Sequence, residues 1–254
     1  MKSRILEINN LTKRFGGLTA VAGLDFDVHE GEILGVIGPN GAGKSTTFNI
    51  IAGAYPASGG EIRFAGEPIL GLPPHRIAQR GIMRTFQHNR PFPGMSVAEN
   101  VLVGAHTRFH AGIFSRKSRK EEQEMRLRAE ELIGFVGLAG ADGADVTTLS
   151  FGQGRLLEIA RALAGEPKLM LFDEPAAGLT PAELTRVASV IRGIAERGIA
   201  VLLIEHDMHF LLPLAHRVVV LNFGAKIADG LPGEIRANPA VMEAYLGGGH
   251  AAAR

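Results

Sequence analysis

The sequence predicts an α/β fold built around a mainly parallel sheet. Short runs rich in Ile, Val and Leu alternate with longer stretches of helical periodicity, which is the order of elements in such folds. Three of the short runs are continuously apolar, as expected of strands buried on both faces of a parallel sheet. The chain has 254 residues, 46% of them hydrophobic, so it can form one domain, or one domain with a subdomain, around a sizeable core.

The elements of this α/β part are expected from the apolar runs and the periodic segments between them. The predicted strands are residues 32–38, 83–87, 169–173, 200–205 and 218–222. The predicted helices between them include residues 44–53, 120–136, 155–165 and 181–197.

Two regions depart from this alternation. Residues 1–31 and 58–68 contain short strand and turn patterns, which predict a small antiparallel sheet beside the main one. Residues 88–161 hold several helical patterns but no convincing buried strand, and they follow the turn-rich stretch NRPFPG. We therefore expect an α/β core, with the small antiparallel sheet, over 1–87 and 162–254, and a helical subdomain inserted over 88–161.

Composition excludes several classes of function. The net charge of +1 argues against a broad electrostatic contact with nucleic acid, so no nucleic-acid partner is expected. The absence of cysteine excludes a disulfide framework and thiolate catalysis, and it fits a reducing compartment. The start MKSRILEINN lacks the apolar core of a secretory signal, and apolar stretches such as 199–204 fall far short of the ~20 residues of a membrane span. Any connection to a membrane is expected to come through a partner.

The strongest motif is GPNGAGKST at residues 38–46. It satisfies G-x-x-x-x-G-K-[ST] between a predicted strand and a predicted helix, as a phosphate-binding loop requires. Its glycines let backbone N–H groups converge on phosphates, Lys44 reaches the β- and γ-phosphates, and Ser45 offers a hydroxyl to Mg²⁺. The alternative, an accidental glycine turn, is disfavoured by this context. The predicted nucleotide-binding residues of the loop are Gly38, Pro39, Asn40, Gly41, Ala42, Gly43, Lys44, Ser45 and Thr46.

A second motif, LMLFDEP at 169–175, is a buried strand that delivers two carboxylates at its carboxyl end, where α/β sheets bind ligands. Asp173 is placed to hold the Mg²⁺ shell, through water. Glu174 is placed to orient or polarise the water that attacks the γ-phosphate. The alternative is a strand capped by two surface acids, which the upstream phosphate loop disfavours.

Three further side chains are candidates for the same site. His206 follows the buried strand in LLIEHDM and is placed to contact the γ-phosphate or hold the water, although a lone histidine is more often structural. His206 and His209 have i, i+3 spacing but no third ligand, so we reject a zinc site. Gln87 ends a strand before the helical insertion and can coordinate Mg²⁺ or the water. Phe15 can stack on a flat base. In isolation, however, a Gln is usually a surface residue and a Phe is usually a core residue.

The stretch LSFGQGRLLEIARAL at 149–163 predicts a helix that begins after Ser150. Ser150 is a favourable N-cap, and two glycines follow it before an apolar-periodic run. A helix amino terminus offers unpaired N–H groups and a positive dipole end, which suit an anion. The chain thus carries a second anion cradle about a hundred residues after the phosphate loop.

These stretches, in this order and spacing, resemble the nucleotide-binding subunit of ABC transporters over essentially the whole chain. In that resemblance residues 38–46 are the Walker A loop, 169–174 the Walker B strand with catalytic Glu174, and 149–153 the signature, including Ser150, Gly152 and Gln153. The resemblance also matches Gln87 to the Q-loop glutamine, His206 to the switch histidine and Phe15 to the aromatic platform for adenine. It implies the ABC ATPase fold: a P-loop (RecA-like) core, a small antiparallel β subdomain and an inserted helical subdomain.

A closer resemblance is to the ATPase subunit of branched-chain amino acid importers, specifically the longer of the two. It is carried by RFGGLTAV, LPPHRIAQRGIMRTFQHNRPFPGMSVAENV, DEPAAGLTP, IEHDM and NPAVMEAYLG. Phe151 in place of the usual signature glycine resembles the same group, and Phe15 replaces the commoner Tyr without loss of stacking surface. Gly154 stands where Gln or Glu is usual. Thr180 replaces the Asp or Asn of the D-loop, which bears on communication between sites.

The resemblance implies that ATP and Mg²⁺ are bound between two cassettes packed head to tail. Ser150 and Gly152 of the partner subunit would then cover the γ-phosphate held at Lys44, in a homodimer or a heterodimer. The implied function is ATP hydrolysis that powers uptake of branched-chain, aliphatic amino acids. The implied location is the cytoplasmic face of the inner membrane, where permease subunits hold the chain. Gln87 and residues 88–105 would couple closure to the permeases, and a periplasmic binding protein would be an indirect partner.

Three alternatives stay open at this point. The same enzyme could serve another transporter, such as one for urea or short-chain amide uptake or for lipopolysaccharide export. A soluble ABC ATPase of DNA repair or translation usually carries tandem cassettes, coiled coils or basic extensions, which this chain lacks. An inert nucleotide-binding module is disfavoured because Glu174 and His206 are both present.

Overall fold

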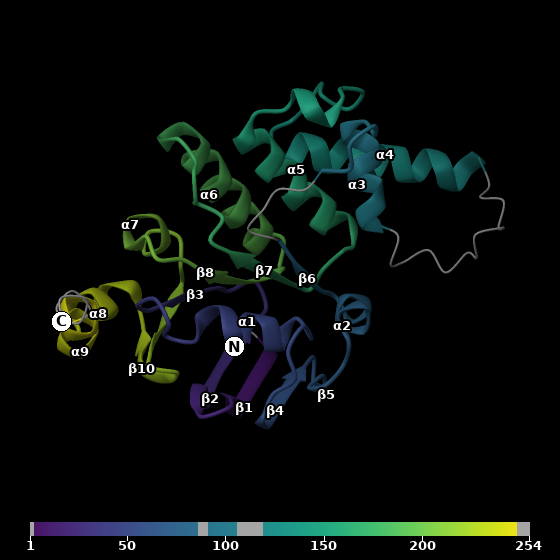
Figure 1. Cartoon of the computed structure of the whole chain (residues 1–254). Helices are drawn as coiled ribbons and strands as arrows, with labels where there is room; N and C mark the ends of the chain where they lie inside the picture. Colours follow the sequence, from purple (N-terminus) through teal and green to yellow (C-terminus); the bar gives the residue numbers. More distant parts are fainter. Residues whose placement is uncertain (1–2, 86–90, 106–118, 248–254) are drawn as a thin grey trace.

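A six-stranded sheet with the order β10-β9-β3-β8-β7-β6 forms the centre of the computed structural model, which describes residues 3–85, 91–105 and 119–247 (Figure 1). All neighbouring strands are parallel except β10, which pairs antiparallel with β9. The α/β fold class is confirmed. The strands are β3 (Ile33–Ile37), β6 (Ile82–Arg84), β7 (Leu169–Asp173), β8 (Ala200–Ile204), β9 (Arg217–Asn222) and β10 (Ala225–Gly230).

The predicted antiparallel sheet is also present, with the order β2-β1-β4-β5. Its strands are β1 (Arg4–Phe15), β2 (Leu18–His29), β4 (Gly59–Phe64) and β5 (Glu67–Pro68). The first two strands have 12 residues each and are longer than the short strands predicted, because register shifts let β1 continue pairing past its polar residues.

Helices cover both faces of the central sheet. The helices are α1 (Lys44–Ile51), α2 (Pro74–Arg80), α3 (Val97–Gly104), α4 (Arg119–Phe135), α5 (Phe151–Ala164), α6 (Pro181–Glu196), α7 (Met208–Leu211), α8 (Pro232–Ala237) and α9 (Pro239–Gly247), with a 3₁₀ turn at Val146–Thr148. In Figure 1, α1 lies between the two sheets, whereas α3, α4 and α5 gather on the other side of the central sheet. Among the described residues, none of these helices is both long and apolar enough to cross a membrane.

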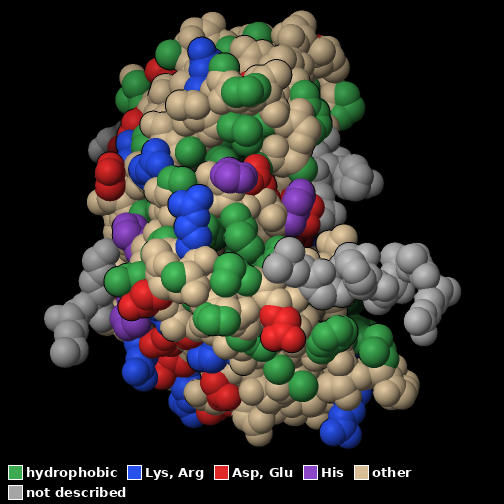
Figure 2. All heavy atoms as spheres, turned by 90° about the vertical axis from the view of Figure 1, so that its left-hand side faces the viewer, with side chains coloured by type: hydrophobic (Ala, Val, Ile, Leu, Met, Phe, Trp, Pro, Cys, Tyr) green, Lys and Arg blue, Asp and Glu red, His purple; other side chains and the backbone are tan. Residues whose placement is uncertain are grey.

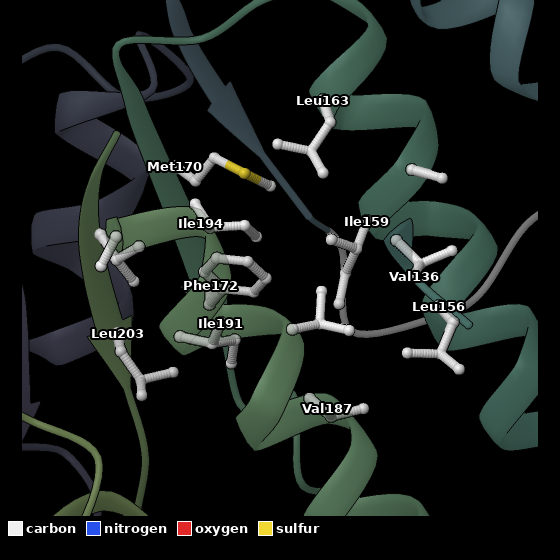
Figure 3. Packing of buried hydrophobic residues seen from close by; sticks show 14 of the residues in the cluster. Val136, Leu156, Ile159, Leu163, Met170, Phe172, Val187, Ile191, Ile194 and Leu203 are labelled. Carbon is white, nitrogen blue, oxygen red and sulfur yellow. The ribbon is translucent and has the colours of Figure 1, made fainter. Parts of the chain in front are cut away.

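Two apolar cores flank the central sheet, which explains why its strands are continuously apolar. On β7, Met170 and Phe172 face the core shared with α5 and α6, whereas Leu169 and Leu171 face the core shared with α1. Figure 3 shows Phe172 and Met170 among Ile191 and Ile194 of α6 and the inward side chains of α5. A strand that buries both faces has no reason to alternate apolar and polar residues.

An ion-pair cluster ties the antiparallel sheet to the central one. Arg217 at the start of β9 pairs through Nη2 with Asp27 Oδ1 on β2 at 2.9 Å, through Nε with Glu32 Oε1 at 2.9 Å, and through Nη1 with Asp229 Oδ1 at 3.0 Å. Figure 2 shows acidic and basic side chains next to one another on one face of the molecule. The cluster lies at the start of β3, because Arg217 is paired with Leu34 and Glu32 directly precedes the strand.

Candidate functional site

The loop at residues 38–43 leads from the end of β3 into α1. Gly43 is the N-cap of α1 with φ 98°, and no side chain caps this helix. A Cβ at Gly43 would lie 2.5 Å from the backbone oxygen of Ala20, and one at Gly38 would overlap the backbone oxygen of Leu221. Glycine is therefore required at both positions by close approach of the neighbouring backbone. The uncapped helix start leaves N–H groups available for an anion.

Lys44 is almost fully buried within this loop. Its Nζ donates to the carbonyl oxygens of Gly38 at 2.6 Å and Pro39 at 3.0 Å. Burial lowers the pKa of Lys44, while the negative charges of Glu174 and Asp173 act in the opposite direction. The ammonium group thus lies inside the loop, within the field of both predicted carboxylates.

The carboxylates of β7 and the histidine after β8 come together at the carboxyl edge of the sheet. Glu174 follows β7 with φ 50°, a left-handed conformation uncommon outside glycine, and its amide donates to Ile204 O at 3.0 Å. Its Oε1 lies 3.7 Å from Nδ1 of His206, whose side chain is 60% exposed. That separation brings the two groups within ion-pair range but leaves a direct hydrogen bond unmade.

Another acidic residue, Glu205, lies next to His206 at this edge of the sheet. It is fully buried, accepts from the Ala176 amide at 2.8 Å and lies 3.9 Å from His206 Nδ1. Burial raises the pKa of Glu205, partly offset by hydrogen bonds from the amides of Ala176 and His206. Sequence reasoning gave Glu205 no role, although an acid directly after a buried strand was a usable signal.

Asp173 is 2% exposed and pairs with Arg84 of β6, whose Nη2 lies 2.7 Å from Asp173 Oδ2. Its other oxygen, Oδ1, is buried and makes no hydrogen bond among the described residues. Sequence reasoning also missed Arg84. The signal was an arginine at the end of a short strand, because a charge that is largely removed from water requires a partner.

The residues at hand fit a Mg²⁺ ion held together with nucleotide phosphates. Ser45 is exposed at the start of α1, and Asp173 offers its unpaired oxygen. Hydroxyl and carboxylate oxygens are the hard ligands that Mg²⁺ takes alongside substrate phosphates. Within the described ranges no cluster of three or more His, Cys, Asp or Glu side chains could hold a metal alone. Gln87, the third predicted metal ligand, lies outside the described residues.

A cleft of about 320 Å³ opens over the loop. It is lined by Asn40 to Thr46, by Glu174, and by Phe15, Leu18 and Ala20 from the antiparallel sheet. Phe15 is 45% exposed at the end of β1, with the Lys13 ammonium 4.7 Å from its ring centroid and the Tyr55 ring edge-on at 5.9 Å. An aromatic face therefore lies at one end of the cleft and the phosphate loop at the other.

The second anion cradle lies in a different cleft. Ser150 is the N-cap of α5 and forms a capping box with Gln153, so the helix begins directly after Ser150, as its N-cap predicted, and four residues before the periodic run at 155–165. Ser150, Gly152 and Gln153 line a cleft of about 250 Å³ with Glu183 of α6. The two clefts share no lining residue among those described. The structure thus separates two groups of predicted site residues within one chain.

The carboxylate of Glu183 lies against this cradle. A Cβ at Gly152 would overlap the Glu183 carboxylate. The amide and hydroxyl of Thr180 each donate to Glu183 Oε2 at 2.9 Å. These hydrogen bonds lower the pKa of Glu183, and the Gly152 amide and the Ser150 hydroxyl add to the effect. Thr180, the unusual D-loop residue, is therefore the N-cap of α6.

Comparison with known proteins agrees with this arrangement. The ABC transporter family model matches residues 21–177, and the branched-chain amino acid ATP-binding cassette transporter model matches residues 225–251. The chain is 45% identical to the high-affinity branched-chain amino acid transport ATP-binding protein BraF of Pseudomonas aeruginosa, covering 97% of this chain and 99% of that one. It is 40% identical to LivG of Escherichia coli K12, a protein of the same description, over the same shares.

Solved structures show the same fold. The ADP conformation of an ATP-binding cassette of an ABC transporter superposes with a TM-score of 0.85 at 32% identity, over 96% of this chain and 99% of that one. A dimeric post-hydrolysis cassette bound to ADP and Pi gives 0.76 at 25% identity, over 90% and 99%. The resemblance found in the motifs is confirmed. The chain belongs to the ABC transporter ATP-binding family, in its branched-chain amino acid group.

Proposed function

We propose that this chain is the ATP-hydrolysing subunit of an importer for branched-chain, aliphatic amino acids. The observation that carries the proposal is the placement of Glu174 and His206 beside a phosphate loop cleft, with the signature cradle in a separate cleft. ATPase activity coupled to transport accords with membership of the family.

The nucleotide lies along the first cleft, with its base at one end and its phosphates at the other. The adenine ring stacks on Phe15, while backbone N–H groups of residues 38–46 surround the phosphates. Lys44 exchanges its hydrogen bonds with the carbonyls of Gly38 and Pro39 for the β- and γ-phosphate oxygens. Ser45, Asp173 and Gln87 hold Mg²⁺, which neutralises charge on the phosphates when bound.

Hydrolysis uses the carboxylate that projects beside the γ-phosphate. Glu174 orients a water molecule and accepts its proton as the water oxygen bonds to the γ-phosphorus, and the bond to the β-phosphate oxygen breaks to give ADP and phosphate. His206, 3.7 Å from Glu174, holds the water or the γ-phosphate.

The second cradle serves the nucleotide of another subunit. Because Ser150, Gly152 and Gln153 lie outside the cleft of their own Lys44, they meet a γ-phosphate only when a second cassette packs against this face. ATP then contacts both subunits and favours the closed pair, and phosphate loss removes that bias.

The remaining assignments concern the assembly. The chain sits at the cytoplasmic face of the inner membrane, held by permease subunits, with a periplasmic binding protein as an indirect partner. Residues 88–161 form the helical subdomain, and the insert at 88–105 with Gln87 couples closure to the permeases. Residues 1–87 and 162–254 form the nucleotide-binding core.

Two variants test the catalytic and dimeric parts separately. Glu174→Gln should retain ATP binding, measured with a fluorescent ATP analogue, while turnover collapses and ATP drives association in analytical ultracentrifugation. Ser150→Arg should bind ATP equally well but neither hydrolyse it nor associate. Near-normal turnover in Glu174→Gln would overturn the catalytic assignment, and normal turnover in Ser150→Arg would overturn the shared site.

The transported solute is tested with the whole transporter in proteoliposomes. We expect a binding protein loaded with leucine or valine to stimulate ATP hydrolysis, while the same protein offered urea or a short-chain amide does not. Stimulation by urea or an amide alone would replace the proposed substrate with that of the alternative transporter.

A further inference from the structure

Arg84 connects three elements that the nucleotide site needs in register. It lies on β6, the edge strand of the central sheet, opposite Leu171 of β7. Its Nη2 contacts Asp173 Oδ2 at 2.7 Å, and its Nη1 donates to Asn49 Oδ1 at 2.6 Å. Asn49 belongs to α1, the helix that follows the phosphate loop. One guanidinium group therefore joins the phosphate-loop helix, the carboxylate strand and the edge strand.

Burial makes this contact necessary. Asp173 is 2% exposed, and a carboxylate removed from water is costly unless a cation and hydrogen bonds compensate it. Lys44 directs its ammonium group to the carbonyls of Gly38 and Pro39 instead. Within the described part of the chain, Arg84 is the only cation that forms an ion pair with Asp173.

The geometry uses only one of the two carboxylate oxygens. Arg84 contacts Oδ2, whereas Oδ1 is buried without a hydrogen bond among the described residues. The guanidinium is planar, and its second Nη is anchored on Asn49, so its position is defined at two points. It therefore fixes the position of Asp173 Oδ2 and leaves Oδ1 to another ligand.

We propose that Arg84, supported by Asn49, is a positioning residue that orients Asp173 for the Mg²⁺ ion of the nucleotide site. The proposal rests on the proposed function, because it concerns the metal that accompanies ATP. It extends that function to two residues that touch neither the nucleotide nor the reacting water. Groups that orient a metal ligand typically contribute about 10–100-fold to metal affinity.

The test compares ATP affinity in excess Mg²⁺ with ATP affinity in EDTA, measured by binding alone. We expect Mg²⁺ to tighten ATP binding to the parent chain. In Arg84→Met this Mg²⁺-dependent gain should fall about tenfold or more, while the affinity in EDTA changes less than about threefold. Arg84→Lys keeps the charge but loses the planar guanidinium, so its Mg²⁺-dependent gain should lie between those of the parent chain and Arg84→Met. Asn49→Ala should reduce the gain modestly.

Arg63→Met is the matched control. Arg63 is a paired, half-exposed arginine on β4 of the antiparallel sheet, and its replacement should leave the Mg²⁺-dependent gain unchanged. The thermal midpoint of each variant without nucleotide separates a general loss of stability from the metal effect. If Arg84→Met does not fold, the folded Arg84→Lys and Asn49→Ala variants provide the same comparison.

An unchanged Mg²⁺-dependent gain in folded Arg84→Met or Arg84→Lys would overturn the inference and leave Arg84 with a structural role. A parent chain whose ATP affinity does not respond to Mg²⁺ would also overturn it. A parent that shows the gain in binding but hydrolyses no ATP would instead refute the proposed function and leave the inference standing.

Discussion

At the scale of single residues, the phosphate loop is shaped as much by its neighbours in space as by its own sequence. Gly41 and Gly43 both have positive φ, at 80° and 98°, yet their surroundings differ. A Cβ at Gly41 would meet nothing within 4 Å, whereas one at Gly43 would lie 2.5 Å from the backbone oxygen of Ala20. The motif therefore combines one glycine required by conformation with another required by conformation and contact.

This difference predicts unequal costs for two alanine substitutions. Gly41→Ala should lower the free energy of unfolding by about 1–2 kcal/mol, the strain of a left-handed alanine. Gly43→Ala should lower it by a further ~1–3 kcal/mol, because the backbone of β2 must move to admit the methyl group. Urea unfolding without nucleotide measures both values. Equal losses of unfolding free energy in the two variants would mean that the backbone at Ala20 moves aside without a cost in stability.

Glu205 predicts a pH-dependent effect on stability. Burial raises its folded-state pKa above the usual 4.5, so the folded chain binds this proton more tightly than the unfolded chain. The ionised carboxylate therefore costs stability, and the cost grows as the pH rises from about 4.5 through the folded-state pKa.

Glu205→Gln removes the charge and keeps an oxygen for the Ala176 amide. The free energy of unfolding of the variant, minus that of the parent, should thus become more positive between pH 5 and pH 8. Urea titrations at three pH values measure this difference. A difference that does not vary with pH would contradict the assignment.

At the scale of elements, α5 and α6 meet through their amino termini at the signature cradle. Glu183 accepts hydrogen bonds from Thr180, which is the N-cap of α6. The carboxylate of Glu183 also lies against Gly152 at the start of α5. The cradle proposed to receive the partner's γ-phosphate therefore already faces a negative charge within its own chain.

We expect Glu183→Gln to strengthen ATP-driven association. Glutamine keeps the capping box but removes the charge that the incoming γ-phosphate would meet. In a Glu174→Gln background, half-maximal association should need about two- to fivefold less ATP, the equivalent of ~0.3–1 kcal/mol at a helix terminus. Glu234→Gln is the control, because Glu234 accepts from the Leu231 amide at the start of α8, away from the signature. A higher ATP requirement in Glu183→Gln would show that the carboxylate assists closure.

The elements that the sequence predicted well are those whose environment leaves a local pattern. β7 matches its prediction at 169–173, and α6 ends one residue before the predicted 197, because a fully apolar strand and a capped amphipathic helix are encoded within a few residues. The short α2 and α7 and the strand β10 were not predicted. β10 is half-buried and pairs at the sheet edge, so tertiary pairing decides its conformation.

The candidate site likewise contains some residues that the sequence predicted and others that it did not. The phosphate loop, Glu174 and His206 were predicted because their chemistry requires fixed residue types at strand ends. Arg84 and Asn49 were not predicted, because their roles depend on contacts that form only in the fold. Arg84 is 35 residues from Asn49 and 89 residues from Asp173 in the sequence. Motif reasoning identifies the groups that act on a ligand more readily than those that hold the acting groups in place.

At the scale of the whole molecule, one apolar core joins the helical region to the central sheet. It contains Leu132 and Ile133 of α4 together with Phe172 of β7 and Leu203 of β8. Figure 3 shows Val136, just after α4, on the α5 side of the cluster that contains Phe172. The proposed helical subdomain therefore has no core separate from that of the nucleotide-binding part, within the residues described.

This shared core predicts that the helical region and the central sheet unfold together. Leu132→Ala, at a residue 1% exposed, should lower the free energy of unfolding of the whole chain by about 2–5 kcal/mol. Leu127→Ala, on the same helix but 57% exposed, should change it by less than ~0.5 kcal/mol. Hydrogen exchange followed by mass spectrometry gives the local readout: in Leu132→Ala the slowest amides of α4 and β3 should accelerate by the same factor. Acceleration confined to α4 would show that the helical region opens independently of the central sheet.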